Sequence, residues 1–190
     1  AVGYHNTPLT GNRENMKGLK FTPGPEAIKE YIPILEKSSD IIVVLSHAGT
    51  AVDELTAKEV DGIDLIIGGH SHDLISPPRK VNGTFIVQAL SDGAILGETR
   101  LILKNNRLID VRTDHHYLWN DEWEPDRETM ELVARLRSPY EDKLQEKIAT
   151  TPTVIGRQYK SESPFDKLVG NLLREEYNAE AVSYTHLTLP

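Results

Sequence analysis

Two near-continuous runs of β-branched apolar residues, at positions 41–45 and 63–67, restrict this chain to few folds. Such runs are typical of strands that are buried on both faces of a parallel sheet. Residues 51–60 between them predict a helix, and Thr50 with Asp53 predicts a capping box at its start. Together they indicate a β-α-β unit, whose right-handed crossover places the two strands side by side, or nearly so, in one sheet.

The remainder of the chain alternates between predicted helices and strands. Strands are predicted at residues 84–89, 98–104, 108–113 and 154–159, with a hairpin turn at 105–106. Helices are predicted at 25–37, 125–149 and 165–177, and residues 1–23 are predicted to form a loop. Pro33 should kink the first of these helices or delay its start, and Ser138-Pro139 should interrupt the second. Ser163 and Asp166 predict a second capping box.

Composition and charge exclude several classes of protein. Hydrophobic residues make up 38% and charged residues 26% of the 190, which is typical of a globular chain rather than a disordered one. The net charge of -8, without a local basic stripe, argues against nucleic acid as a partner. An anionic small substrate stays open, because bound cations can dominate the field of a site. The chain has no cysteine and no apolar run approaching the ~20 residues of a membrane span.

Three histidines follow the two strands of the β-α-β unit. His47 comes directly after the first strand, and His70 and His72 come directly after the second. Ligands of open parallel sheets bind beyond the carboxyl ends of the strands, and the crossover brings these two ends to one edge. We therefore expect the three imidazoles to converge. A glycine pair, Gly68-Gly69, lets the backbone turn tightly beside them.

Converging neutral imidazoles indicate a metal site for Zn, Mn, Fe or Co. A lone histidine after a strand is usually a surface residue, so His47 alone would carry little weight. The Gly-Gly-His-x-His pattern of His70 and His72 makes metal binding the favoured interpretation. The pair could point to one metal or divide between two adjacent ions, which in two-metal sites lie ~3.5–4 Å apart and clamp an in-line displacement at phosphorus.

Other residues near these histidines are weaker candidates. Gly69, Ser71, Asp73 and Gln88 could line the site or orient its ligands. For Gln88 a satisfied structural amide is an equal alternative, and for Asp73 the default is a solvated loop carboxylate. The remaining histidines have no predicted role: His115 and His116 trail a hairpin strand, and His5 and His186 lie near the termini.

Several segments together resemble a known family. They are Leu45-Ser46-His47-Ala48-Gly49, residues 62–72 ending in Gly-Gly-His-Ser-His, Gln88-Ala89 with Leu96-Gly97, and Gly170-Asn171-Leu172. The chain resembles the 5'-nucleotidase family of calcineurin-like metallophosphoesterases over residues 24–182. The resemblance implies two divalent metal ions (Zn, Mn, Co, Mg or Fe), with His47 and His70 binding one and His72 the other.

The resemblance also implies the domain organisation and an α/β fold class. Residues 1–118 would be the C-terminal part of a metallophosphoesterase β-sandwich flanked by helices, residues 119–149 a helical connector, and residues 150–190 the truncated start of the family's C-terminal nucleotide-binding α/β domain. Residues 183–190 depart from the family pattern, and we interpret them as non-native.

The family's other metal ligands and its catalytic histidine lie upstream of the matched segments. We therefore expect no catalytic residue in this chain beyond metal ligands. Three neutral imidazoles without carboxylates should bind metal weakly, so we expect this fragment to be inactive.

The function implied for the parent protein is metal-dependent hydrolysis of nucleotide phosphate esters, with a small nucleotide as the substrate. Alternatives within the family are a 2',3'-cyclic-nucleotide phosphodiesterase, a nucleotide-sugar or dinucleotide pyrophosphatase, and a thiosulfohydrolase. A non-catalytic metal-binding or nucleotide-binding module is the alternative from another class. The resemblance implies a periplasmic, extracellular or cell-surface location, and the oligomeric state stays open.

Overall fold

The computed structural model describes residues 1–157 and 162–181, and its contacts divide the chain into two units, Ala1–Glu124 and Pro125–Pro190. Each unit is described by itself. The domain boundaries predicted after residues 118 and 149 stay predictions. Within the described part of the chain, no helix combines the length and apolar character that a bilayer-crossing segment needs.

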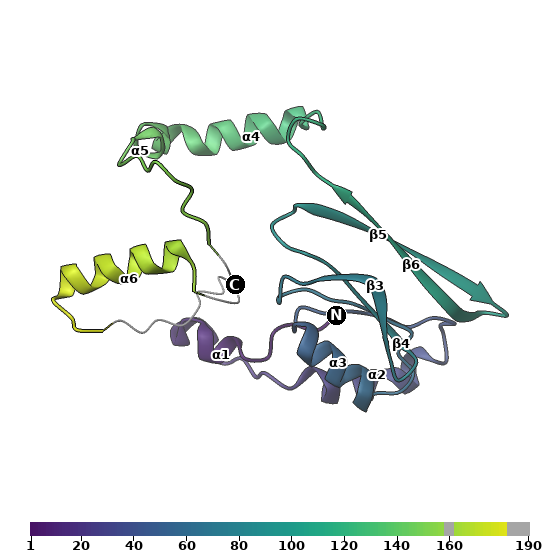
Figure 1. Ribbon diagram of the computed structural model, residues 1–190. Coiled ribbons are helices and arrows are strands. Elements are labelled where there is room, and N and C mark those ends of the chain that lie inside the picture. The colour runs from purple at the N-terminus through teal and green to yellow at the C-terminus, as the bar shows by residue number, and fades with distance from the viewer. Residues whose placement is uncertain (158–161, 182–190) are drawn as a thin grey trace. The chain divides into compact units, whose positions relative to one another are not determined.

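The first unit is built on a four-stranded sheet that contains the predicted β-α-β unit (Figure 1). Strand β1 (Val43–Leu45) pairs in parallel with β2 (Leu65–Ile67), and helix α3 (Thr50–Glu59) connects them. Strand β4 (Thr84–Ala89) continues the parallel pairing on the other side of β2, so the strand order is β1-β2-β4-β3. The prediction of two adjacent parallel strands joined by a helix is confirmed.

Strand β3 (Leu74–Val81) was not predicted from the sequence. It runs antiparallel to β4 at the edge of the sheet, with a register shift between Ile75 and Arg79. The shift contains Pro77 and Pro78, and the Ser76-Pro77 peptide bond is cis. Proline cannot donate to a strand ladder, so a Pro-Pro pair argues against a central strand but is tolerated at an edge.

Helices cover one face of the sheet, and a hairpin covers part of the other (Figure 1). Helix α2 (Gly24–Leu35) packs with α3 against the central strands, and Pro33, in the last turn of α2, does not delay its start. The side chains that form this cluster are Ile28, Ile32, Ile42, Val44, Ala57, Val60, Ile63, Ile66, Ile75 and Ile86. A smaller cluster on the opposite face joins Leu65, Phe85 and Val87 to Val111. Burial on both faces explains the apolar run of β2, whereas Val43 and Leu45 of β1 are exposed on one face.

The hairpin consists of β5 (Ile95–Lys104) and β6 (Arg107–Tyr117), as the sequence predicted. Its turn residues Asn105 and Asn106 both have positive φ, 52° and 59°, the backbone of the hairpin turn that Asn tolerates well. The predicted loop at residues 1–23 contains two single turns, α1 (Thr7–Thr10) and a 3-10 turn at Arg13–Met16.

The second unit contains α4 (Arg127–Arg137), a 3-10 turn (Ser138–Tyr140), α5 (Glu141–Gln145) and α6 (Pro164–Tyr177). The predicted interruption at Ser138-Pro139 is therefore present. The capping box of Ser163 and Asp166 at the start of α6 is confirmed. The predicted strand at 154–159 is wrong for residues 154–157, which form no strand. Residues 158–159, His186 and the segment 183–190 lie outside the described residues.

Candidate metal-binding site

The predicted site residues gather where the three parallel strands end. His47 lies two residues beyond β1, the Gly68–His72 segment follows β2, and Gln88 is the penultimate residue of β4. Because β1, β2 and β4 are parallel, their carboxyl ends share one edge of the sheet. The topology therefore places side chains from three distant parts of the sequence at one edge.

The structure brings His47 and His70 together. Their ring centroids lie 5.1 Å apart, and the rings meet edge to face at 70°. His72 is near enough to His70 for the two to interact electrostatically. Within residues 1–157 and 162–181, however, no three or more His, Cys, Asp or Glu side chains form a group that could hold a metal ion. The assignment of all three histidines as metal ligands therefore stays a prediction.

The environment of His70 favours its neutral form. Partial burial lowers the pKa of its imidazole below the usual value, and the nearby His47 and His72 lower the pKa further. The neutral imidazole is the form that binds a metal ion. The two adjacent rings and the low proton affinity of His70 thus fit a divalent cation.

A tyrosine that the sequence did not single out also belongs to this site. Tyr4 stacks on His70, with ring centroids 4.1 Å apart and an interplanar angle of 26°. It is held there because Val2 forms a parallel bridge to the edge of β1, donating to the Leu45 carbonyl and accepting from the His47 N–H, both at 2.9 Å. A lone tyrosine in a polar N-terminal segment carries no pattern from which this contact could be predicted.

The backbone of the His70 loop is unusual. The Ser71 N–H donates to the Gly69 carbonyl at 3.0 Å, and the central residue His70 has a φ of 76°. This is the rarer and strained form of the γ-turn. His72 also has a positive φ, 55°, so two non-glycine residues of one loop adopt left-handed backbone. Gly69 allows the loop to pass close to His47, because a Cβ at Gly69 would lie 3.3 Å from the His47 Nδ1.

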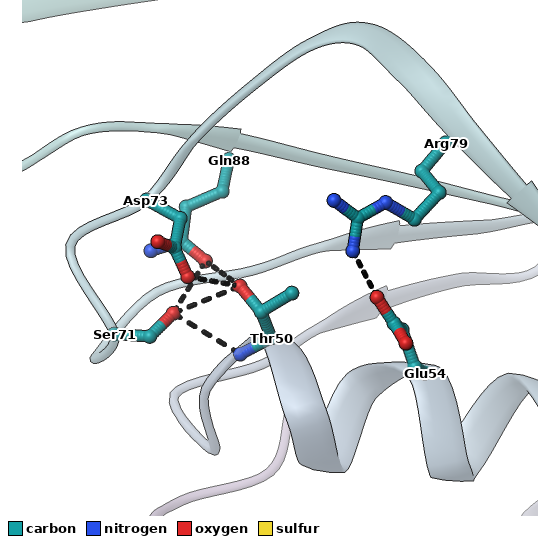
Figure 2. Close-up of polar contacts among 6 residues, drawn as sticks. All are labelled: Thr50, Glu54, Ser71, Asp73, Arg79 and Gln88. Atoms are coloured by element: carbon teal, nitrogen blue, oxygen red, sulfur yellow. Dashed lines mark hydrogen bonds and ion pairs between the residues drawn. The ribbon is translucent and has the colours of Figure 1, made fainter.

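A cluster of four polar side chains, Thr50, Ser71, Asp73 and Gln88, lies beside this loop (Figure 2). We call it the Thr50 cluster. Its presence corrects the predicted capping box. Helix α3 has Gly49 as its N-cap, without a side-chain cap, and the Thr50 hydroxyl donates to the Asp73 carboxylate at 2.7 Å instead. The tertiary contact replaces the local one, and no local pattern in the sequence distinguishes the two.

Gln88 closes the cluster from the end of β4 and is only 3% exposed. In the amide orientation that gives both the oxygen and the nitrogen of Gln88 a hydrogen-bond partner, the oxygen accepts from the backbone N–H of His72 at 3.0 Å and of Asp73 at 2.9 Å. Its nitrogen then lies 3.2 Å from the Ser71 Oγ. Gln88 is therefore a satisfied structural amide that accepts from the backbone of the loop carrying the candidate ligands, and its lining of a metal site stays a prediction.

The second half of the supposed capping box, Asp53, is buried under the site with 1% of its surface exposed. One carboxylate oxygen accepts from the Ser46 hydroxyl, which in turn accepts from the Ala48 N–H at 3.2 Å. The other oxygen has no hydrogen-bond partner among the described residues. It lies against Gly68, where a Cβ would come within 2.5 Å of it. Burial raises the pKa of Asp53 more strongly than the Ser46 hydrogen bond lowers it.

The buried carboxylate predicts a specific pH dependence of stability. A raised pKa means that the folded state holds the proton more tightly than the unfolded state, so the free energy of unfolding falls as the pH rises from the unfolded value of 3.8 through the folded pKa. Asp53→Asn removes this loss, because the amide does not titrate. We therefore expect the variant to gain about 1 kcal/mol in free energy of unfolding over the unmodified chain at neutral pH, and to show no such gain at pH 4. Urea unfolding of both proteins across this range measures the effect. Parallel profiles for the two proteins would contradict it.

No family model matches the chain, but the chain is similar to several known proteins. The chain is 26% identical to the trifunctional nucleotide phosphoesterase protein YfkN of Bacillus subtilis over 174 residues, which are 87% of this chain and 12% of that protein. It is 43% identical to bovine 5'-nucleotidase over 85 residues, 42% of this chain and 14% of the relative. Other relatives are named apyrases and metallophosphoesterases.

The fold has a counterpart among solved structures. The sulfate thiohydrolase SoxB of Thermus thermophilus matches 97% of this chain and 38% of its own length, with a TM-score of 0.85 and 22% identity. At that identity the match establishes the fold alone. The chain spans about a third or less of the first relatives it matches.

Proposed function

Because the chain belongs to the 5'-nucleotidase family of calcineurin-like metallophosphoesterases, we propose that it supplies one wall of a two-metal centre that hydrolyses phosphate esters of nucleotides. His47 and His70 would hold one divalent cation and His72 the other, and the cation could be Zn, Mn, Co, Mg or Fe. The observation that carries the proposal is the contact between the His47 and His70 rings at the carboxyl edge of the sheet.

Bound cations would supply charge neutralisation at the transferring phosphoryl group. The residues of this chain would hold and orient them. The surroundings of His70 lower its pKa and favour the neutral imidazole. The loop that carries His70 and His72 has a strained backbone, and the Gln88 amide accepts from that backbone. The nucleotide substrate is inferred from the relatives, whose names are nucleotide phosphoesterase, 5'-nucleotidase and apyrase.

The described residues also support the expectation that this chain alone turns over little or no substrate. Within the described ranges, no three His, Cys, Asp or Glu side chains, with or without a carboxylate, form a group that could hold a metal ion. Carboxylate ligands supply the negative charge that keeps two dications together. A centre made only of these three imidazoles would hold its metals weakly.

The test is an assay of phosphate release with Mn²⁺ or Zn²⁺, made on the product of the complete gene and on the 190-residue chain. For the gene product we expect hydrolysis of AMP that EDTA abolishes and added metal restores. For the chain we expect no more turnover than its His47→Ala, His70→Ala double variant shows. A gene product without metal-dependent hydrolysis of any nucleotide would refute the proposed function, whereas a turning-over chain would refute only the expected inactivity.

The substrate within this class is decided by a panel on the gene product. Mononucleotides, 2',3'-cyclic nucleotides, dinucleotides, nucleotide sugars and sulfur esters would be compared by kcat/KM. We expect the nucleotide monophosphates to lead, because bovine 5'-nucleotidase is 43% identical to this chain over 85 residues. The proposed location is outside the cytoplasm, at the cell surface, in the periplasm or in the medium, and cell fractionation tests it.

A further inference from the structure

We propose that Thr50, the first residue of α3, is a positioning residue that holds the His70–His72 loop in its strained conformation. The use of that loop for metal binding rests on the proposed function, but the contact itself does not. Thr50 would act through Ser71 and Asp73, the residues that follow His70 and His72 in the chain.

The loop needs such support because its backbone is costly. His70 and His72 have φ values of 76° and 55°, a backbone region that non-glycine residues rarely adopt because of steric strain. One internal bond of the loop, from the Ser71 N–H to the Gly69 carbonyl, spans a γ-turn. A conformation of this kind persists only when surrounding groups determine it.

Thr50 contacts the loop through both its backbone and its side chain (Figure 2). Its N–H donates to the Ser71 Oγ at 3.1 Å, and its hydroxyl donates to the Asp73 Oδ2 at 2.7 Å. A hydroxyl has only one hydrogen, so at 2.9 Å the Thr50 oxygen accepts from the Ser71 hydroxyl. The hydroxyl hydrogens of Thr50 and Ser71 then both have an acceptor, and the Ser71 oxygen can still accept from the Gln88 amide.

The position of Thr50 at the start of a helix restricts its conformation. Gly49, with a φ of 92°, turns the chain from the His47 segment directly into α3, so Thr50 is fixed by the first turn of a helix. A β-branched side chain has few χ1 rotamers there. The same residue therefore links the segment that carries His47 to the loop that carries His70 and His72.

The test uses two substitutions at Thr50 and one matched control. Thr50→Val keeps the shape and the β-branch but removes the hydroxyl, and Thr50→Ser keeps the hydroxyl. The control is Thr56→Val in the same helix. Thr56 is buried, whereas Thr50 is half-buried, and the Thr56 hydroxyl donates to the Val52 carbonyl within α3 at 2.8 Å.

Two measurements on the 190-residue chain report on the loop. Amide hydrogen exchange of Ser71, His72 and Asp73, followed by NMR, reads its conformation directly, because their N–H groups donate to Gly69 and Gln88. Titration with Co²⁺, followed by visible absorption, reads the imidazole ligands. For Thr50→Val we expect at least tenfold faster exchange at these amides and tenfold weaker Co²⁺ binding than for Thr56→Val, with exchange at the buried Ile66 and Ile86 alike. Thr50→Ser should restore both readouts.

The outcomes separate the two proposals. Equal loop exchange in Thr50→Val and Thr56→Val overturns the role of Thr50, and so does faster exchange that spreads equally to Ile66 and Ile86. If the unmodified chain gives no Co²⁺ signal at any concentration, its proposed metal-binding role fails, while the exchange comparison still decides whether Thr50 holds the loop.

Discussion

Replacing Gly68 with alanine is expected to lower the free energy of unfolding of residues 1–124 by about 3 kcal/mol. The new Cβ would stand 2.5 Å from the Asp53 carboxylate and 3.2 Å from the Gln88 side chain. Asp53 is buried and bonded to Ser46, so it cannot move away cheaply. Unfolding in urea, followed by amide exchange of Ile66 and Ile86 at the centre of the sheet, measures the loss.

The matched control is Gly3→Ala, because a Cβ at Gly3 would meet nothing within 4 Å. We expect this variant to unfold as the unmodified chain does. The prediction concerns sterics and not backbone conformation, since Gly68 is not among the glycines with positive φ. A Gly68→Ala variant as stable as the control would mean that the contact between Gly68 and Asp53 does not constrain the strand end.

His70→Ala is expected to lower kcat/KM of the complete gene product about thousandfold, equivalent to about 4 kcal/mol of transition-state stabilisation. His70 is in contact with both the His47 ring and the Tyr4 ring, so its removal takes away a candidate ligand and the centre of the aromatic contacts. Hydrolysis of AMP at saturating Mn²⁺ and at limiting Mn²⁺ measures the effect. Excess metal should restore only a small part of the activity.

His116→Ala is the control for this substitution. His116 lies on β6, is exposed, and its Nε2 sits 3.1 Å from the Glu98 carboxylate. Its loss should leave kcat/KM within about twofold, because exposed ion pairs contribute little. Equal activity of the His70→Ala and His116→Ala proteins would remove His70 from the centre.

The fold of the first unit follows from the sequence where burial decides it. Residues 63–67 are apolar because β2 packs on both faces, with Ile66 in one cluster and Leu65 in the other. The two apolar runs and the helix between them predict the parallel pairing, although Val43 and Leu45 of β1 are exposed on one face. The edge strand β3 was missed, because Pro77 and Pro78 oppose the strand pattern that its pairing with β4 nevertheless imposes. Local propensity is reliable for central elements and weaker at edges, where tertiary pairing decides.

The site could be predicted only at the level of which residues gather. The topology rule that ligands collect at the carboxyl ends of parallel strands correctly brought His47 and His70 together. It could not reveal that Thr50 bonds to Asp73 beside the loop and Asp53 to Ser46 instead of forming a helix cap, because Ser/Thr-x-x-Asp/Glu has the same form in both cases. Sequence spacing offers two partners to a hydroxyl, and only the packed structure selects one.

The strand order β1-β2-β4 has a thermodynamic consequence. The groups that form the site come from residues near 4, 47, 70 and 88, and only the assembled sheet brings them together. A partly folded chain that lacks one strand pairing would lose the site completely, so a cation bound there binds the folded state alone. By linkage, a divalent ion at a hundred times its dissociation constant would add about 2.7 kcal/mol to the folding free energy of this unit. The stability of this unit would thus depend on the concentration of the metal ion.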